Sequence, residues 1–123
     1  MNNKILIVED DEPIRDSLIE LLEFEGYQVL STSNGQEALD CLMSLSKDGL
    51  PGLILLDLMM PVKDGYQFCL EKNNIITLSE IPVLIMSADN QIKEKQMETK
   101  AKDYIKKPFD IEKVLAMVKE YAR

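Results

Sequence analysis

Short apolar runs alternate with longer segments of mixed polarity along the whole of this 123-residue chain. Unbroken runs of β-favouring residues at 4–8, 53–57 and 82–87 predict buried strands, and shorter runs at 27–31 and 103–106 predict two more. The run at 53–57 is apolar on both faces, so it predicts a central strand with helices packed against both sides of the sheet.

The segments between these runs carry apolar residues at helical spacing. The acids and proline at 11–13 predict the start of the first helix, because such residues favour a helix N-terminus, and Gly26 predicts its end. Asn34 predicts the cap of a second helix, and further helices are predicted over about 65–72 and from Ile111. Strands that alternate with helices predict an α/β fold, in which right-handed crossovers give a doubly wound parallel sheet of five strands.

A single domain over 1–123 is expected, because the chain contains no repeat or linker and can bury a core without disulfides. Two stretches resist assignment by pattern. The stretch 73–80 has no clear period, and the polar segment 90–100 offers only Ile92 and Met97 as apolar anchors. We expect the helix in that polar segment to be short, displaced or mobile.

Composition and charge exclude several functions. With 14 basic and 22 acidic residues the net charge is -8, so binding to nucleic acid is not expected. No apolar run approaches the roughly 20 residues that cross a bilayer, and no signal-peptide layout is present, so a cytoplasmic protein without membrane contact is expected. The absence of histidine excludes serine–histidine triads, histidine zinc sites and an internal phosphohistidine donor. Cys41 and Cys69 are expected to be buried free thiols.

Chemically active side chains stand where the predicted strands end. Glu9 and Asp10 follow the first strand, Asp57 closes the third, Ser87 closes the fourth and Lys107 follows the fifth. Because the carboxyl ends of parallel strands converge on one rim, we expect three carboxylates, a hydroxyl and an ammonium in one crevice. This set suits a divalent cation held by carboxylates and an aspartate that accepts a phosphoryl group, whose oxygens the hydroxyl and the lysine receive.

Four segments follow one another in the order and spacing of a known family: ILIVEDDEPIR, LILLDLMMPVKDG, IPVLIMSA and DYIKKPF. The chain resembles a response-regulator receiver domain, the phosphoacceptor unit of bacterial two-component signalling, over essentially its whole length. The resemblance implies a flavodoxin-like sheet with strand order 2-1-3-4-5. It also implies that Asp57 accepts a phosphoryl group from a sensor histidine kinase or a phosphotransfer protein.

The resemblance further implies a set of metal ligands. Mg²⁺, for which Mn²⁺ substitutes, would be held by three carboxylates and one backbone carbonyl, those of Glu9, Asp10, Asp57 and Met59. Asp10 would contact the metal directly and Glu9 mostly through a bound water. Met59 and Asp89 stand at positions that vary in the family and influence how long the phosphoryl group persists.

Three more roles follow from the resemblance. Lys107 matches the family's lysine because it directly precedes Pro108, and a cis peptide at this proline would turn the lysine inward. Alternation along the strand then turns Lys106 to solvent. Ser87 would donate to a phosphoryl oxygen. Together with Tyr104, the aromatic switch residue, it would transmit the structural change that follows phosphorylation.

Each assignment has a plainer alternative. The acids at 11–12 are better explained as helix N-terminal residues than as ligands. Asp57 could cap its strand, although an aspartate after four apolar residues is costly unless its charge is used. Ser87 could be a strand-end hydroxyl, Tyr104 an ordinary core residue and Lys107 a surface residue.

The implied protein is a stand-alone receiver and not principally an enzyme, a monomer or a weak phosphorylation-dependent dimer whose downstream protein target binds the face 90–121. Lys100 stands where the family usually has glycine, which puts that face in question. An aspartate-nucleophile phosphatase is the alternative, but such enzymes need a second aspartate where this chain has Met59. A flavin-binding electron carrier would need a hydroxyl- and glycine-rich loop at 9–11, where the chain has Glu-Asp-Asp.

Overall fold

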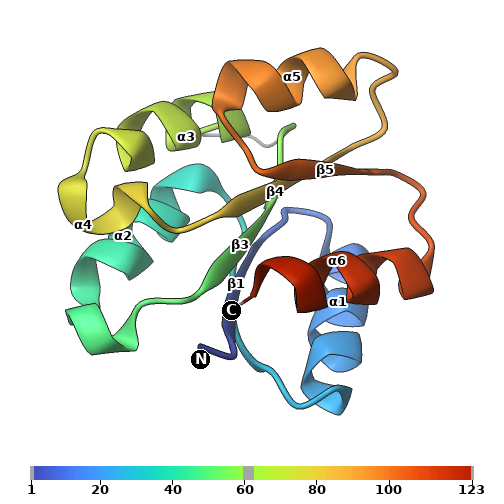
Figure 1. Cartoon of the computed structure of the whole chain (residues 1–123), viewed down its shortest axis with the longest axis horizontal. Helices are drawn as coiled ribbons and strands as arrows, with labels where there is room; N and C mark the ends of the chain where they lie inside the picture. The colour runs from blue at the N-terminus through green and yellow to red at the C-terminus, as the bar shows by residue number, and fades with distance from the viewer. Residues whose placement is uncertain (1, 60–62, 123) are drawn as a thin grey trace.

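The computed structural model describes residues 2–59 and 63–122. Strands and helices alternate from one terminus to the other (Figure 1). The elements are β1 (Lys4–Val8), α1 (Glu12–Phe24), β2 (Gln28–Thr32), α2 (Gly35–Ser44), the 3₁₀ turn η1 (Lys47–Gly49), β3 (Leu53–Asp57), α3 (Gly65–Asn73), α4 (Ile76–Ser79), β4 (Val83–Ser87), α5 (Ile92–Thr99), β5 (Asp103–Lys106) and α6 (Ile111–Tyr121). The five predicted strands are therefore present within about one residue of their expected bounds.

The strands form one parallel sheet in the order β2-β1-β3-β4-β5, which confirms the predicted doubly wound, flavodoxin-like fold. In the register, Val8 pairs with Leu56, and the strands β3 and β4 are aligned so that Asp57 pairs with Met86. Ser87 in turn pairs with Lys106. The carboxyl ends of the four strands therefore lie along one rim of the sheet.

Successive residues of each strand supply two separate cores. On β1, Leu6 and Val8 face the core that α2, α3, α4 and α5 cover, whereas Ile5 and Ile7 face the core under α1 and α6. Figure 1 shows these helices on opposite sides of the sheet. β3 is buried on both faces, as its continuous apolar run predicted. Within the described ranges, no helix has both the length and the apolar character needed to cross a membrane.

Side-chain caps start the helices at the predicted places. The carboxylate of Asp11 accepts a hydrogen bond from the Ile14 backbone N–H, and the side chain of Asn34 caps α2 in the same way. Asp11 is therefore a capping residue, as its position at the helix start suggested. Gly26 adopts a φ of +95° just after α1, a conformation that side chains disfavour, so glycine ends the helix as predicted.

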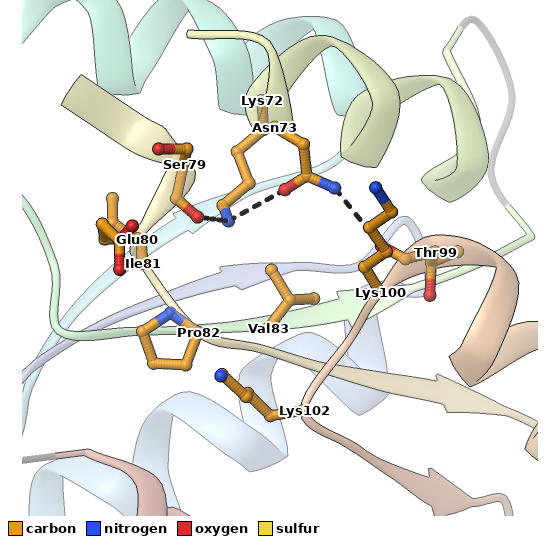
Figure 2. A pocket seen from close by; sticks show the side chains of 10 residues that line it. All are labelled: Lys72, Asn73, Ser79, Glu80, Ile81, Pro82, Val83, Thr99, Lys100 and Lys102. Atoms are coloured by element: carbon orange, nitrogen blue, oxygen red, sulfur yellow. Dashed lines mark hydrogen bonds between the residues drawn. The ribbon is translucent and has the colours of Figure 1, made fainter. Parts of the chain in front are cut away.

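The stretch 73–80, which has no pattern in the sequence, forms the end of α3 and the single turn α4. Leu78 anchors this turn in the core, while Ile76 is 90% exposed. The ammonium of Lys72 donates to the Ser79 carbonyl at 3.1 Å and links the two helices (Figure 2). Tertiary contacts therefore define an element too short to form alone.

Both cysteines are free thiols, but only one is buried as expected. Cys69 is 2% exposed, and burial raises the pKa of its thiol to about 12. The expectation was wrong for Cys41, which is only partly buried because it lies at the edge of the apolar stripe of α2. No disulfide is formed between them.

The polar segment forms a short helix, α5, whose anchors differ from those predicted. Ile92 is buried, but Met97 is 72% exposed, so the expectation that Met97 would anchor this helix was wrong. Thr99 occupies the buried position instead, where its hydroxyl donates to the Lys95 carbonyl at 2.9 Å. Lys100 follows in the left-handed region with a φ of 61°, which explains why glycine suits this position.

Replacing Lys100 with glycine is expected to raise the free energy of unfolding by about 1 kcal/mol, because a side chain in the left-handed region is strained. Glu98→Gly, inside the same helix, is expected to lower it by about the same amount. Urea unfolding of the two variants beside the unaltered protein measures both effects. A destabilised Lys100→Gly protein would show that the lysine side chain contributes more than its strain costs.

Candidate functional site

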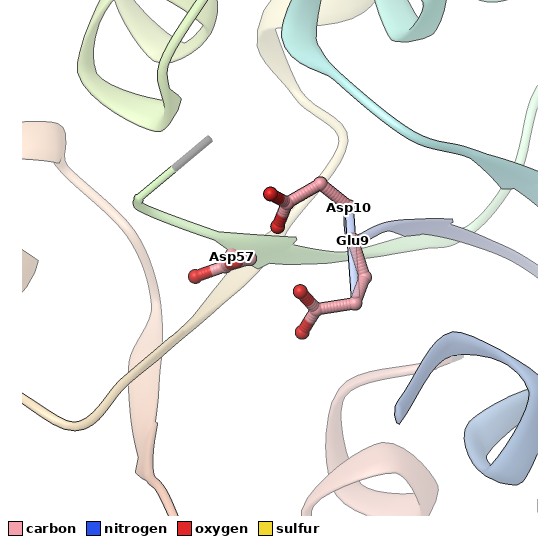
Figure 3. Close-up of side chains that lie close together, drawn as sticks. All are labelled: Glu9, Asp10 and Asp57. Atoms are coloured by element: carbon pink, nitrogen blue, oxygen red, sulfur yellow. The ribbon is translucent and has the colours of Figure 1, made fainter. Parts of the chain in front are cut away.

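Three carboxylates meet where β1 and β3 end. Glu9 is fully buried and its backbone N–H donates to the Thr32 carbonyl at 3.1 Å, which continues the pairing of β1 with β2. Asp57, the last residue of β3, is 5% exposed, whereas Asp10 is exposed. One oxygen from each of these carboxylates lies within 4.8 Å of the others (Figure 3). The sequence therefore predicted this cluster correctly.

Lys107 brings a positive charge to the two buried carboxylates. Its ammonium lies 2.7 Å from a Glu9 oxygen and 3.6 Å from an Asp57 oxygen. Its backbone N–H donates to the Ser87 carbonyl at 2.8 Å, and the Lys107–Pro108 peptide is cis, as predicted. Lys106 is exposed and donates to the Asn90 side chain instead. Because its ammonium lies against two buried carboxylates, Lys107 is not an ordinary surface lysine.

Ser87 and Met59 complete the rim of the crevice. The Ser87 hydroxyl oxygen accepts the Asp89 backbone N–H at 3.1 Å, and the Met59 backbone N–H donates to an Asp57 oxygen at 3.2 Å. The Met59 side chain is 67% exposed. Together with the carboxylates and Lys107 these residues line a cavity of about 340 Å³. A phosphoryl group and a hydrated metal ion fit a space of this size and polarity.

Burial and like charge disfavour ionisation of Asp57. Desolvation, followed by the neighbouring Glu9, raises the pKa of Asp57 to about 7, and the Lys107 ammonium and the Met59 N–H only partly oppose these effects. A divalent cation at the three carboxylates would offset the repulsion. Hard oxygen donors from carboxylates are the ligands that Mg²⁺ prefers, so the residues present fit this metal.

Three supporting residues were missed by reading the sequence. Arg15 donates to the Glu9 carbonyl at 3.0 Å, and the Asp11 backbone N–H donates to the Glu9 carboxylate at 3.3 Å. In the sequence, only the helical spacing of Arg15 from the cap at Asp11 indicated that the arginine could reach the site. Gly65 lets α3 approach the site, because a Cβ there would lie 2.8 Å from the Leu58 Cα.

Tyr104 and Asp89 both lie close to α5. Tyr104 on β5 is half-buried and packs against the core that α5 covers. Asp89 forms a salt bridge of 3.0 Å with Lys95 of α5. The Lys95 ammonium also lies 5.3 Å from the centre of the Tyr66 ring on α3. The loop after Ser87 is therefore connected to α5 and α3 by electrostatic contacts.

Comparison with known proteins agrees with this geometry. The model of the response regulator receiver domain matches residues 5–119, and the chain belongs to this family. Response regulator MprA of Mycolicibacterium vanbaalenii is 35% identical over 122 residues, which cover 98% of this chain and 50% of the relative. The chain thus spans about half the length of the curated relatives it matches.

Two solved structures, one of a histidine kinase's receiver domain and one of a chemotaxis protein, show the same fold. The signal receiver domain of a signal transduction histidine kinase from Syntrophus aciditrophicus has a TM-score of 0.85 and 34% identity, over 97% of this chain and 89% of that one. The chemotaxis protein CheY4 of Vibrio cholerae has a TM-score of 0.85 and 25% identity, over 96% of this chain and 97% of that one. The fold and the family are therefore shared with both.

The raised pKa of Asp57 predicts how stability depends on pH without metal. The native carboxyl, with a pKa of about 7 against an ordinary 3.8, binds its proton more tightly than the unfolded chain does. Its contribution is therefore fully present below about pH 4 and is lost as the pH rises to about 7. Because one pKa unit corresponds to about 1.4 kcal/mol, the loss between about pH 5 and 8 is on the order of 2 kcal/mol.

Urea unfolding with a chelator present, at about pH 5 and 8, measures this loss. Asp57→Asn lacks the titrating group and is expected to show a much smaller decrease over the same window. An equal decrease in both proteins would assign the pH dependence to other groups.

Proposed function

We propose that residues 1–123 act as a phosphorylation-controlled signalling domain, in which Asp57 accepts a phosphoryl group from a sensor histidine kinase or a phosphotransfer protein. The observation that carries this proposal is the position of Asp57. Its carboxylate is buried beside Glu9, faces the Lys107 ammonium and opens on a cavity of about 340 Å³. A buried carboxylate in such a setting suits nucleophilic attack on phosphorus.

In the proposed step, an oxygen of Asp57 attacks the phosphorus of phosphohistidine. The new bond joins this oxygen to phosphorus, the phosphorus–nitrogen bond breaks, and the histidine leaves with the bonding electrons. Lys107 pairs with one phosphoryl oxygen and Ser87 donates to another, so both stabilise negative charge where it accumulates. Mg²⁺, or Mn²⁺ in its place, would be held by Glu9, Asp10, Asp57 and the Met59 carbonyl, and supplies positive charge when bound.

The site does not favour the alternative of a phosphatase with an aspartate nucleophile. Such an enzyme needs an acid two residues after the nucleophile, and the chain has Met59 there, with its side chain directed largely to solvent. We therefore propose a phosphoacceptor that only phosphorylates and dephosphorylates itself, and not a turnover enzyme. Met59, which lines the cavity, and Asp89, whose backbone N–H donates to the Ser87 hydroxyl, would influence how water reaches the phosphorus.

The signal would leave the site through Ser87 and Tyr104. A phosphoryl group adds a charge of about -1.5 to -2 and attracts the Ser87 hydroxyl, which at present accepts the Asp89 N–H. Movement of this loop would open space for Tyr104 to pack further inward and would shift α5. The surface 90–121 is thus the proposed binding face for a downstream protein partner or for a second copy of the chain.

A small acyl phosphate with Mg²⁺ is expected to add one phosphoryl group to the chain, and Asp57→Asn is expected to abolish the addition, because it removes the nucleophilic oxygen. Intact-mass spectrometry detects the modification. Asp40→Asn, which alters an exposed carboxylate on α2, is the matched control and should label normally. Undiminished labelling of Asp57→Asn would contradict the assignment.

Mg²⁺ is expected to raise the melting temperature, because a ligand that binds only the native state stabilises it by mass action. Asp10→Asn is expected to weaken Mg²⁺ binding by about tenfold or more, since it removes one charged ligand. Asp16→Asn on the exposed face of α1 controls for the loss of one negative charge. Identical melting curves in Mg²⁺ and in chelator would rule out the metal site.

A further inference from the structure

A second cavity, of about 330 Å³, lies where β4 and β5 start, whereas Asp57 lies where β3 ends. Its walls come from the ends of α3, α4 and α5 and from the starts of β4 and β5 (Figure 2). Ile81, Pro82 and Val83 supply its apolar lining. Three lysines, Lys72, Lys100 and Lys102, line the same cavity. In a chain with a net charge of -8, this is an unusual concentration of positive charge.

Lys72 is the innermost of these lysines. It is only 3% exposed, and its ammonium donates to the Ser79 carbonyl at 3.1 Å and to the Asn73 side chain at 3.3 Å. Both partners are neutral, and Lys72 forms no salt bridge within the described part of the chain. A buried ammonium without a counter-charge is costly. Burial accordingly lowers the pKa of Lys72, with the nearby Lys102 acting in the same direction and Cys69 and Glu80 opposing it.

Lys100 and Lys102 place two further charges at the mouth of the cavity. Both are exposed, and neither forms a salt bridge with any residue in the described ranges 2–59 and 63–122. Lys100 holds its position in the left-handed conformation that ends α5. Glu80 is the one carboxylate among the residues that line the cavity, so positive charge predominates there.

We propose that the cavity lined by Lys72, Lys100 and Lys102 binds a phosphate group, either free or carried on a small molecule. A multiply charged oxyanion would form the salt bridge that Lys72 does not make with the described residues, and it would occupy the remaining N–H donor of Lys72. The volume is at the lower end of the range for small-molecule sites, which suits a phosphate or a small phosphate ester. This site is separate from Asp57 and does not depend on the function proposed above.

The position of the cavity gives such binding a structural consequence. The Asn73 side chain already donates to the Thr99 carbonyl at 3.4 Å, so the end of α3 contacts the end of α5. An anion held by Lys72 on α3 and Lys100 after α5 would strengthen this connection. The bound state would therefore restrain α5 at its C-terminal end.

The test is a titration of the isotope-labelled chain, without metal, followed by NMR at the backbone amides of Asn73, Glu80, Thr99 and Lys102. The probes are inorganic phosphate and glycerol phosphate, and sodium chloride at matched ionic strength is the reference. We expect saturable shifts at these amides with phosphate. Tighter binding of glycerol phosphate would identify a phosphate ester as the ligand, and equal affinity would identify the free anion. The amides of Met59 and Ala88 report separately on any binding near Asp57.

Variants connect the shifts to the lysines. Lys72→Met is expected to weaken phosphate binding by about tenfold or more, because it removes the buried charge-assisted donor. Lys102→Gln and Lys100→Gly are each expected to weaken it by about threefold. Lys113→Gln, on the exposed face of α6, is the matched control and should leave the affinity unchanged.

Lys100→Gly keeps the test decisive even if Lys72→Met does not fold, because glycine suits the left-handed position and the variant should remain folded. Saturable shifts that weaken in the cavity variants and not in Lys113→Gln support the proposal. The proposal would be overturned if sodium chloride at the same ionic strength produced the same shifts as phosphate. It would also be overturned if Lys100→Gly and Lys102→Gln left the affinity for phosphate unchanged.

Discussion

Like charge buried at the carboxyl ends of neighbouring strands is the constraint on which this structure depends. Apolar β1 and β3 lie side by side in the middle of the sheet, and they carry Glu9 and Asp57 into the interior. The two carboxylates repel each other there, and Lys107 is the internal cation that offsets part of this repulsion. A further positive charge would stabilise a site in this state, which is why the proposed phosphoryl acceptance and the proposed metal binding belong together in it.

The two ends of the sheet are opposite in charge. The rim at the end of β4 holds an excess of carboxylates, whereas the cavity at the start of β4 is lined by Lys72 and two exposed lysines. α5 is connected to both ends. Lys95 near its middle pairs with Asp89 after β4, and Thr99 at its end contacts the side chain of Asn73. α5 itself buries only Ile92 and Thr99, so little apolar packing holds it against the sheet.

Sequence reasoning succeeded where local chemistry and periodicity agree. Asp11, Asn34 and Gly26 act as caps or stops in almost any context, because their side chains or their backbone freedom satisfy helix ends locally. It failed where packing decides. The single turn α4 exists because Leu78 is buried, and Met97 is exposed because α5 turns Ile92 and Thr99 inward instead.

The order of apolar runs and the residues that end them were enough to predict the parallel sheet and the convergence of Glu9, Asp10, Asp57, Ser87 and Lys107, since strand alternation and parallel pairing leave little freedom. The tertiary structure alone decided which cations reach which carboxylates. It places Lys107 against Glu9 and Arg15 on the Glu9 carbonyl, and it leaves Lys72 buried without a salt bridge in the described structure. Such pairings depend on distances of a few ångströms between segments far apart in the chain, and periodicity carries no information about them.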